Sequence, residues 1–137
     1  LGYKNEKYMD LGYFPAKNDD LFNLVPARLT ALLMNISSIG RFNVSNGFKI
    51  VKRDRHNHKS PNSGYPESAV AGLLGIQLGG GNYYFGKFVS KPHIGDLINK
   101  VDKKHISNTI EIMYRAEILF LVFYIVITCF THTLIRI

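Results

Sequence analysis

Acidic and basic side chains of this 137-residue chain gather in a few short polar clusters that could bind phosphate, carboxylate or a divalent cation. Carboxylate oxygens suit Mg²⁺ next to substrate phosphates, and a carboxylate can also take a proton from an attacking amine. A guanidinium can grip phosphate or carboxylate through two parallel hydrogen bonds. The candidates are the acids Asp19, Asp20, Asp54 and Glu67 and the anion binders Arg28 and Arg53. From composition alone, exposed salt-bridge partners remain the alternative interpretation of the acids.

A glycine-rich segment, GGGNYYFG at 79–86, could cradle phosphate with its main-chain N–H groups. It is not a Walker loop, because no GK[ST] follows at the required spacing. Read alone, it is more typical of a helix stop than of a ligand loop.

Metal-bound histidine and covalent catalysis find little support. His56 and His58 match no zinc spacing. Ser60 precedes a proline and lacks the GxSxG context of a nucleophile. Cys129, the one cysteine, lies inside an apolar run that contains no Asp, Glu, Lys or Arg.

The segment from 118 to 135, ILFLVFYIVITCFTHTLI, contains no Asp, Glu, Lys or Arg. Its length is enough for an α-helix to cross a bilayer. A soluble helix of this length usually shows a polar face, so a membrane span is favoured over a buried core helix. We expect the last helix to occupy 107–137, with Ser107 as its N-cap.

Residues 24–40 predict an earlier helix, membrane-embedded or interfacial, since Arg28 and several small polar residues interrupt its apolar centre. Pro26 suits a first helical turn, and Asn23 could cap it. Residues 1–23 are interpreted as a polar loop.

Residues 41–106 are interpreted as a basic, loop-rich region. The chain carries 17 Lys and Arg against 10 Asp and Glu, a formal net charge of +7, and the excess is concentrated here. Because positive charge favours the cytoplasmic side of a membrane protein, we place this region inside the cell. Short helices are expected at 46–54 and 68–78, the second rich in small residues that allow close helix approach and ended by Gly79–Gly81.

Together these clusters resemble the cobalamin-biosynthesis membrane proteins of the adenosylcobinamide-phosphate synthase family. The matching stretches are GYKNEKY at 2–8, DLGYFPAKNDDLFNLVPARLTALLM at 10–34, RD at 53–54, HKSPNSGYPESAVAGLLGIQLGGGNYYFG at 58–86, KPHIGD at 91–96 and MYRAEILFLVF at 113–123. The combination of VPARLTALL, SPNSGYPE and QLGGGNYYFG is far more specific than any one piece. The resemblance implies a mainly α, multi-pass protein of the cell membrane. This chain, which begins at Leu1, would be its carboxy-terminal part, without the helices that precede it.

The resemblance further implies an amide-forming ligase. Adenosylcobyric acid would be joined, through a corrin propionate, to aminopropanol or to an aminoalcohol phosphate. Amide formation from a free carboxylate requires activation, so ATP and Mg²⁺ are expected, and no tightly bound cofactor is.

In that reaction the catalytic residues would be Asp54, Glu67, Asp19 and Asp20, the last two also holding Mg²⁺. Substrate binding would use basic groups for the anions, asparagines for the corrin amides and tyrosines against the flat macrocycle. These binding residues are Lys4, Asn5, Lys17, Arg28, Arg53, Ser60, Asn62, Asn82, Tyr83 and Tyr84.

Two other classes stay open. A non-catalytic membrane protein, such as a corrinoid carrier or a signalling sensor, would share the apolar final segment, although the dense polar motifs argue against a simple sensor. A soluble nucleic-acid binder would suit the +7 charge. The apolar segment argues against it, and no nucleic-acid partner is expected.

Overall fold

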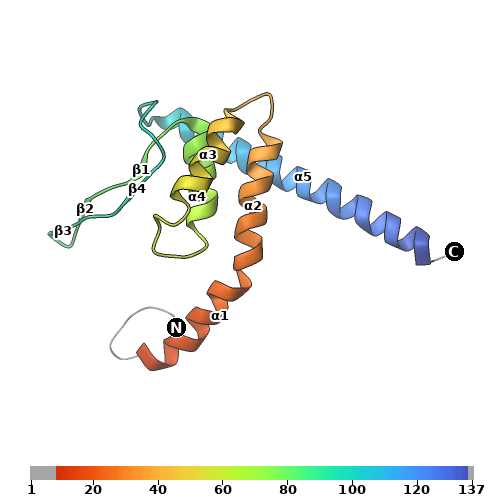
Figure 1. Ribbon diagram of the computed structural model, residues 1–137, viewed down its shortest axis with the longest axis horizontal. Coiled ribbons are helices and arrows are strands. Elements are labelled where there is room, and N and C mark those ends of the chain that lie inside the picture. The colour runs from red at the N-terminus through yellow and green to blue at the C-terminus, as the bar shows by residue number, and fades with distance from the viewer. Residues whose placement is uncertain (1–8, 136–137) are drawn as a thin grey trace.

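The structure is a computed structural model that describes residues 9–135, without the side chains of residues 9–11 and of Tyr84. Within this range the chain is mainly helical, as predicted, with two small antiparallel sheets (Figure 1). The elements are α1 (Met9–Phe22), α2 (Leu24–Ser37), α3 (Val44–Asp54), α4 (Gly64–Leu74), β1 (Leu78–Gly79), β2 (Asn82–Tyr84), β3 (Lys87–Val89), β4 (His93–Ile94) and α5 (Lys103–Ile135).

Helices α1 and α2 follow each other as one bent rod (Figure 1). The prediction of a polar loop over 1–23 was therefore wrong for Met9–Phe22. Main-chain hydrogen bonds continue through the bend, from Asn23 N–H to the Asp19 carbonyl at 3.0 Å. Pro26 has no N–H to offer the carbonyl four residues earlier, which accounts for a bend at this point. Asn23 does not cap α2, because its side-chain amide donates back to the main-chain and carboxylate oxygens of Asp19, both at 2.9 Å.

Helices α3 and α4 cross at two glycines. A Cβ added to Gly72 would lie 2.7 Å from the Asn46 carbonyl oxygen and 2.7 Å from the Cα of Gly47. The Asn46 side-chain amide donates to the Gly72 carbonyl at 2.7 Å across this contact. The small residues of α4 thus allow the close approach that the sequence predicted. The core around it joins α2, α4 and α5 through Ala31, Met34, Val70, Leu73, Leu74, Ile112 and Ala116.

The Gly72→Ala variant is expected to lower the free energy of unfolding by about 1–3 kcal/mol, since the added methyl meets main-chain atoms that cannot rotate away. Thermal unfolding of the protein in detergent, followed by circular dichroism, measures the change. Ser45→Ala, at an exposed position of α3, is the control and should change stability by less than about 0.5 kcal/mol. Equal melting temperatures for the two variants would contradict the tight crossing.

Helix α4 ends at Leu74 and not at Gly79–Gly81, which corrects the sequence prediction. Gly75 takes the left-handed conformation (φ 62°), which glycine adopts without a Cβ clash. The N–H groups of Gly75 and Ile76 then donate to carbonyls of the last turn, in a Schellman motif. The three glycines lie beyond this stop, where β1 pairs with β4.

Strands β2 and β3 form a hairpin that projects away from the helices (Figure 1). Phe85 and Gly86 at its turn both have positive φ, 49° and 77°, as a tight hairpin turn of this kind requires. Residues 41–106 are therefore less loop-rich than predicted: the expected helix at 46–54 is confirmed as α3, and α4 and the strands add further structure.

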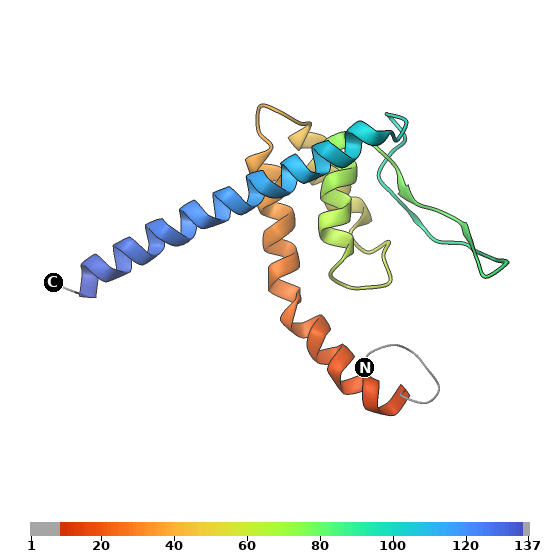
Figure 2. The same ribbon diagram turned by 180° about the vertical axis from the view of Figure 1, so that it is seen from behind.

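Helix α5 begins at Lys103, four residues before the predicted cap Ser107. Asp102 caps it, because its carboxylate accepts the N–H groups of Lys104 at 2.8 Å and of His105 at 3.3 Å. The first part of α5 packs on α2, while the rest extends away from the other elements (Figure 2). Among residues 9–135 it is the one helix long and apolar enough to cross a membrane, and none of its most apolar stretch is buried in the fold.

A charged cluster ties α5 to α2 just before the apolar run. The Glu111 carboxylate accepts two hydrogen bonds from Arg41, at 3.1 and 3.2 Å, and one from Arg115 at 3.0 Å. Arg115 also donates to the Ser37 carbonyl at the end of α2, at 3.3 Å. The Arg41 guanidinium holds the pKa of Glu111 below its usual range. These contacts fix the direction in which the apolar part of α5 leaves the helices.

A candidate polar site between helices α1, α2 and α4

The loop before α4 is anchored to α1 by Asn62. This side chain is buried, and its Nδ2 donates to the main-chain carbonyl of Asp20 at 2.7 Å. Ser60 Oγ accepts the N–H groups of Asn62 at 3.3 Å and of Ser63 at 3.4 Å. The N–H of Ser60 donates to His58 Nδ1 at 3.0 Å. Local side-chain to main-chain bonds of this kind hold the SPNS segment in one conformation against the end of α1.

A cavity of about 380 Å³ lies where this loop faces the bend between α1 and α2. We call it the polar cavity. Its lining residues are Asp19, Asn23, Pro26, Ala27, Thr30, Ser60, Asn62, Ser63 and Pro66. Three residues predicted from the sequence, Asp19, Ser60 and Asn62, thus meet at one site although about 40 positions separate the first from the others. Asp19 is the single charged side chain in this lining.

Sequence reasoning missed three polar residues of this cavity, Asn23, Thr30 and Ser63. The signal for Asn23 was its spacing of four from Asp19, which places two residues on the same face of a helix. A spacing of four indicates a shared face only within a helix. Residues 1–23 were predicted to form a polar loop, so the sequence did not connect Asn23 with Asp19.

Asp19 and Asp20 point to different sides of α1. Adjacent residues of an α-helix point about 100° apart, and only Asp19 lines the polar cavity. Among the residues that the structure describes, no group of three His, Cys, Asp or Glu side chains could hold a metal ion. A Mg²⁺ ion here would take one carboxylate from the protein and the rest of its ligands from substrate phosphates and water, as Mg²⁺ commonly does.

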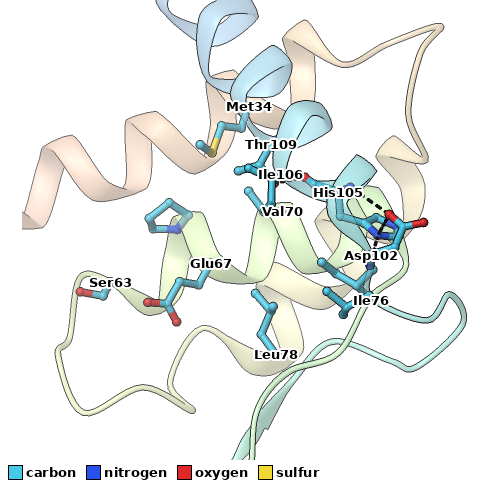
Figure 3. A pocket seen from close by; sticks show the side chains of 12 residues that line it. Met34, Ser63, Glu67, Val70, Ile76, Leu78, Asp102, His105, Ile106 and Thr109 are labelled. Carbon is cyan, nitrogen blue, oxygen red and sulfur yellow. Dashed lines mark hydrogen bonds and ion pairs between the residues drawn. The ribbon is translucent and has the colours of Figure 1, made fainter.

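A second cavity, of about 520 Å³, borders the first turn of α4 (Figure 3). Ser63 and Pro66 border both cavities. Its walls are mainly apolar side chains of α2, α4, α5 and the segments that follow α4 and precede α5. Glu67, Thr109 and the Asp102–His105 pair are polar members. Glu67 lies in the first turn of α4, as predicted, with Oε1 3.8 Å from His58 Nε2.

The predicted anion binders of α1 and α2 lie outside both cavity linings. The Arg28 guanidinium stacks 4.4 Å from the ring centroid of Tyr65 and donates to the Leu24 carbonyl at 2.6 Å. Lys17 is exposed, with Nζ 5.9 Å from the ring centroid of Tyr13. Arg28 connects α2 to the start of α4, next to the polar cavity.

Arg53 and Asp54 form a separate ion-pair cluster at the end of α3. Arg53 binds the Asp54 carboxylate through two hydrogen bonds, at 2.7 and 2.8 Å, and reaches Asp96 at 2.9 Å. The buried Asp54 also accepts the N–H of Gly95 at 2.7 Å. These bonds, the Arg53 guanidinium first, hold the pKa of Asp54 below its usual range although burial opposes them. The cluster fixes the KPHIGD segment to α3, and neither residue lines the two cavities.

The remaining predicted residues do not join the polar cavity. Lys4 and Asn5 lie outside the described residues, as does the side chain of Tyr84. Asn82 and Tyr83 are exposed on the hairpin, where the Tyr83 ring meets Phe88 edge-on at 5.4 Å between centroids.

Comparison with known proteins decides the family of this chain. A family model described as "CobD/Cbib protein" matches residues 1–113. The chain belongs to the CobD/Cbib family. All the residues that line the two cavities fall inside the matched range.

Individual family members agree over nearly the whole chain. The protein named "Cobalamin biosynthesis protein CobD" of Clostridium perfringens is 56% identical over 98% of this chain and 43% of its own length. The protein of the same name in Clostridium acetobutylicum is 53% identical over 95% of this chain and 42% of its own length. "Cobalamin biosynthesis protein CbiB" of Salmonella arizonae is 45% identical over 94% of this chain and 41% of its own length. The chain thus spans about two fifths of these relatives, and no solved structure matches it.

Proposed function

We propose that this chain is part of a membrane enzyme of cobalamin biosynthesis. It would join a propionate carboxylate of adenosylcobyric acid to aminopropanol or its phosphate through an amide bond. The names of its relatives support the pathway. The observation that carries the proposal is the convergence of three motifs, PAKNDD, VPARLTALL and SPNSGYPE, on one polar cavity, in a chain that also has a helix suited to a membrane.

The polar cavity suits the amine of the aminoalcohol better than a phosphate. Asp19 gives its lining a negative charge, and the hydroxyl and amide oxygens of Thr30, Ser60 and Asn62 add hydrogen-bond acceptors. An ammonium group needs three such acceptors, whereas a phosphate without a bound Mg²⁺ would be repelled by Asp19. Phosphate and propionate would instead meet Arg28 and Lys17, the basic groups on the neighbouring helices.

The proposed reaction needs an activated carboxylate. ATP, with Mg²⁺ screening its phosphates, would supply activation by phosphorylating the propionate. Asp19 would first take one proton from the bound ammonium, and the resulting neutral amine would attack the acyl carbon and release phosphate. The second proton would leave with the phosphate or pass to Glu67, which lies beyond the border formed by Ser63 and Pro66. We further propose that Tyr83 and Asn82 on the hairpin meet the corrin ring, and that Arg53 and Asp54 position the segment after it.

The setting of the site follows from the same proposal. Helix α5 would lie in lipid, the basic region between α2 and α5 on the cytoplasmic side, and further helices of the same protein around them. Nucleic acid is not among the proposed partners.

The test is formation of cobinamide phosphate by the full-length protein from cobyric acid, aminopropanol phosphate and ATP with Mg²⁺. The Asn62→Leu variant removes the bond to the Asp20 carbonyl and one acceptor of the polar cavity, so kcat/KM should fall by roughly 10–100-fold. Asn108→Leu, on α5 and outside the polar cavity, is the matched control and should keep wild-type activity. A wild-type protein that binds cobyric acid but forms no amide would overturn the proposal in favour of a carrier or sensor.

A further inference from the structure

We infer that the groove between α2 and α5 is the docking surface for an apolar helix from another part of the same polypeptide, one that carries a basic or hydrogen-bond-donating side chain. The groove encloses about 460 Å³ and lies on the face where α5 leaves α2. Its walls come from Val25, Pro26, Leu29, Thr30, Leu33 and Met34 of α2 and from Met113, Ala116, Glu117 and Phe120 of α5. We call it the α2–α5 groove.

The walls of this groove are apolar and open. Val25, Leu29, Met113 and Phe120 all remain substantially exposed although they line it. Leu29 of α2 and Phe120 of α5 line the same groove, so a single occupant could cover both side chains. The spacing of the α2 wall residues, at 25, 29 and 33, places them on one helix face, which is how one helix receives another.

Glu117 makes lipid a poor occupant. It is exposed in the groove wall and directly precedes the apolar run at 118–135. Among the described residues it has no ion pair or hydrogen-bond partner. A carboxylate next to the hydrocarbon layer faces water or other protein groups and not lipid chains. A helix with a Lys, Arg, Ser, Thr or Asn opposite Glu117 would supply that partner.

The relatives contain enough additional chain to provide such a helix. This chain covers 43% and 42% of the two clostridial proteins, so more than half of each lies outside the aligned part. The residues of the α2–α5 groove up to Met113 fall within the range matched by the family model. An occupant from the same polypeptide would also be present at a high effective concentration.

Photo-crosslinking in the full-length protein tests the inference. A benzophenone amino acid replaces Phe120, membranes are irradiated, and crosslinked peptides are identified by mass spectrometry. We expect crosslinks to an apolar segment of the same molecule outside residues 9–135. Crosslinks only to lipid, or only between two copies of the protein, would overturn the inference.

Two arginine variants provide a matched comparison. Leu29→Arg places a charge in the groove wall and should abolish the crosslink from position 120. Leu32→Arg changes a residue of the same helix with similar exposure, 44% against 39%, that does not line the groove, and should leave the crosslink intact. Because the readout is a crosslink, it is independent of whether the protein forms an amide.

Discussion

The Asp54→Ala variant is expected to unfold with a free energy about 2–3 kcal/mol lower than the wild type. The carboxylate is buried and receives the Gly95 N–H, which would be left unpaired at a cost of about 1–3 kcal/mol. Arg53 is partly exposed and keeps Asp96, so losing its bonds to Asp54 costs less than breaking a fully buried pair. Urea or thermal unfolding in detergent measures the difference.

This contribution depends on pH in a defined direction. The pKa of Asp54 is lower in the folded protein than in the unfolded chain, chiefly because of the Arg53 guanidinium. The stabilisation is therefore complete above the ordinary aspartate pKa of about 4 and is lost as pH falls through the lower folded value. The difference in the free energy of unfolding between the wild type and Asp54→Asn should be constant from neutral pH down to about 5. It should become smaller below about pH 4.

Variants of this ion-pair cluster separate a structural from a catalytic role of Asp54. Asp96→Ala removes an exposed partner of the cluster and should cost less than about 1 kcal/mol. If Asp54→Asn, while folded at neutral pH, keeps kcat, the carboxylate serves to hold the loop. A folded Asp54→Asn protein with no turnover would instead return Asp54 to the chemistry that the sequence suggested.

Cys129 is expected to resist a charged thiol reagent in native membranes by a large factor. In the fold alone its side chain is exposed, so protection would come from lipid or from neighbouring helices and not from the described core. A thiolate is disfavoured in an apolar medium, and the charged reagent does not enter it. Mass spectrometry of the peptide that contains Cys129 follows the reaction. Ser45→Cys, on the exposed face of α3, is the reactive control.

Two lysines in the span should remove this protection. Val122→Lys with Val126→Lys costs about 2.5–3.5 kcal/mol for each charge near the bilayer centre, enough to expel the segment. Cys129 should then react like the Ser45→Cys control. Rapid labelling of Cys129 in the wild-type protein in intact membranes would contradict the placement of α5 in lipid.

Much of the fold follows from local sequence rules. The apolar run at 118–135 predicted a long helix because uninterrupted apolar side chains have no polar face to show to water. The helices α2 and α3 appeared close to their expected ranges. The stop of α4 was misplaced, since Gly75 and the glycines at 79–81 are equally able to end a helix by their residue type. Long-range contacts support the earlier one, because the N–H groups of Ile98 and Asn99 donate to the Gly75 carbonyl at 3.2 and 2.8 Å.

The polar cavity could not be predicted from the sequence. Asp19, Ser60 and Asn62 could be predicted as polar candidates from their residue types. The sequence around them does not show that the three side chains line one cavity. Their meeting depends on one long-range hydrogen bond, from Asn62 to the Asp20 carbonyl, and on the bend at Pro26. Arg53 and Asp54 were predicted in the same way, but the fold places them in a separate ion-pair cluster.

The sequence by itself determined the apolar helix, the positive charge before it and the list of groups able to do chemistry. These properties belong to single residues and to their spacing along one element. The tertiary structure alone decided that Asp19 lines the polar cavity, that Asp20 does not, and that Asp54 is hydrogen-bonded by Arg53 and Gly95. Such assignments depend on the relative orientation of helices, which is set by contacts such as the Gly47–Gly72 crossing between residues far apart in the chain.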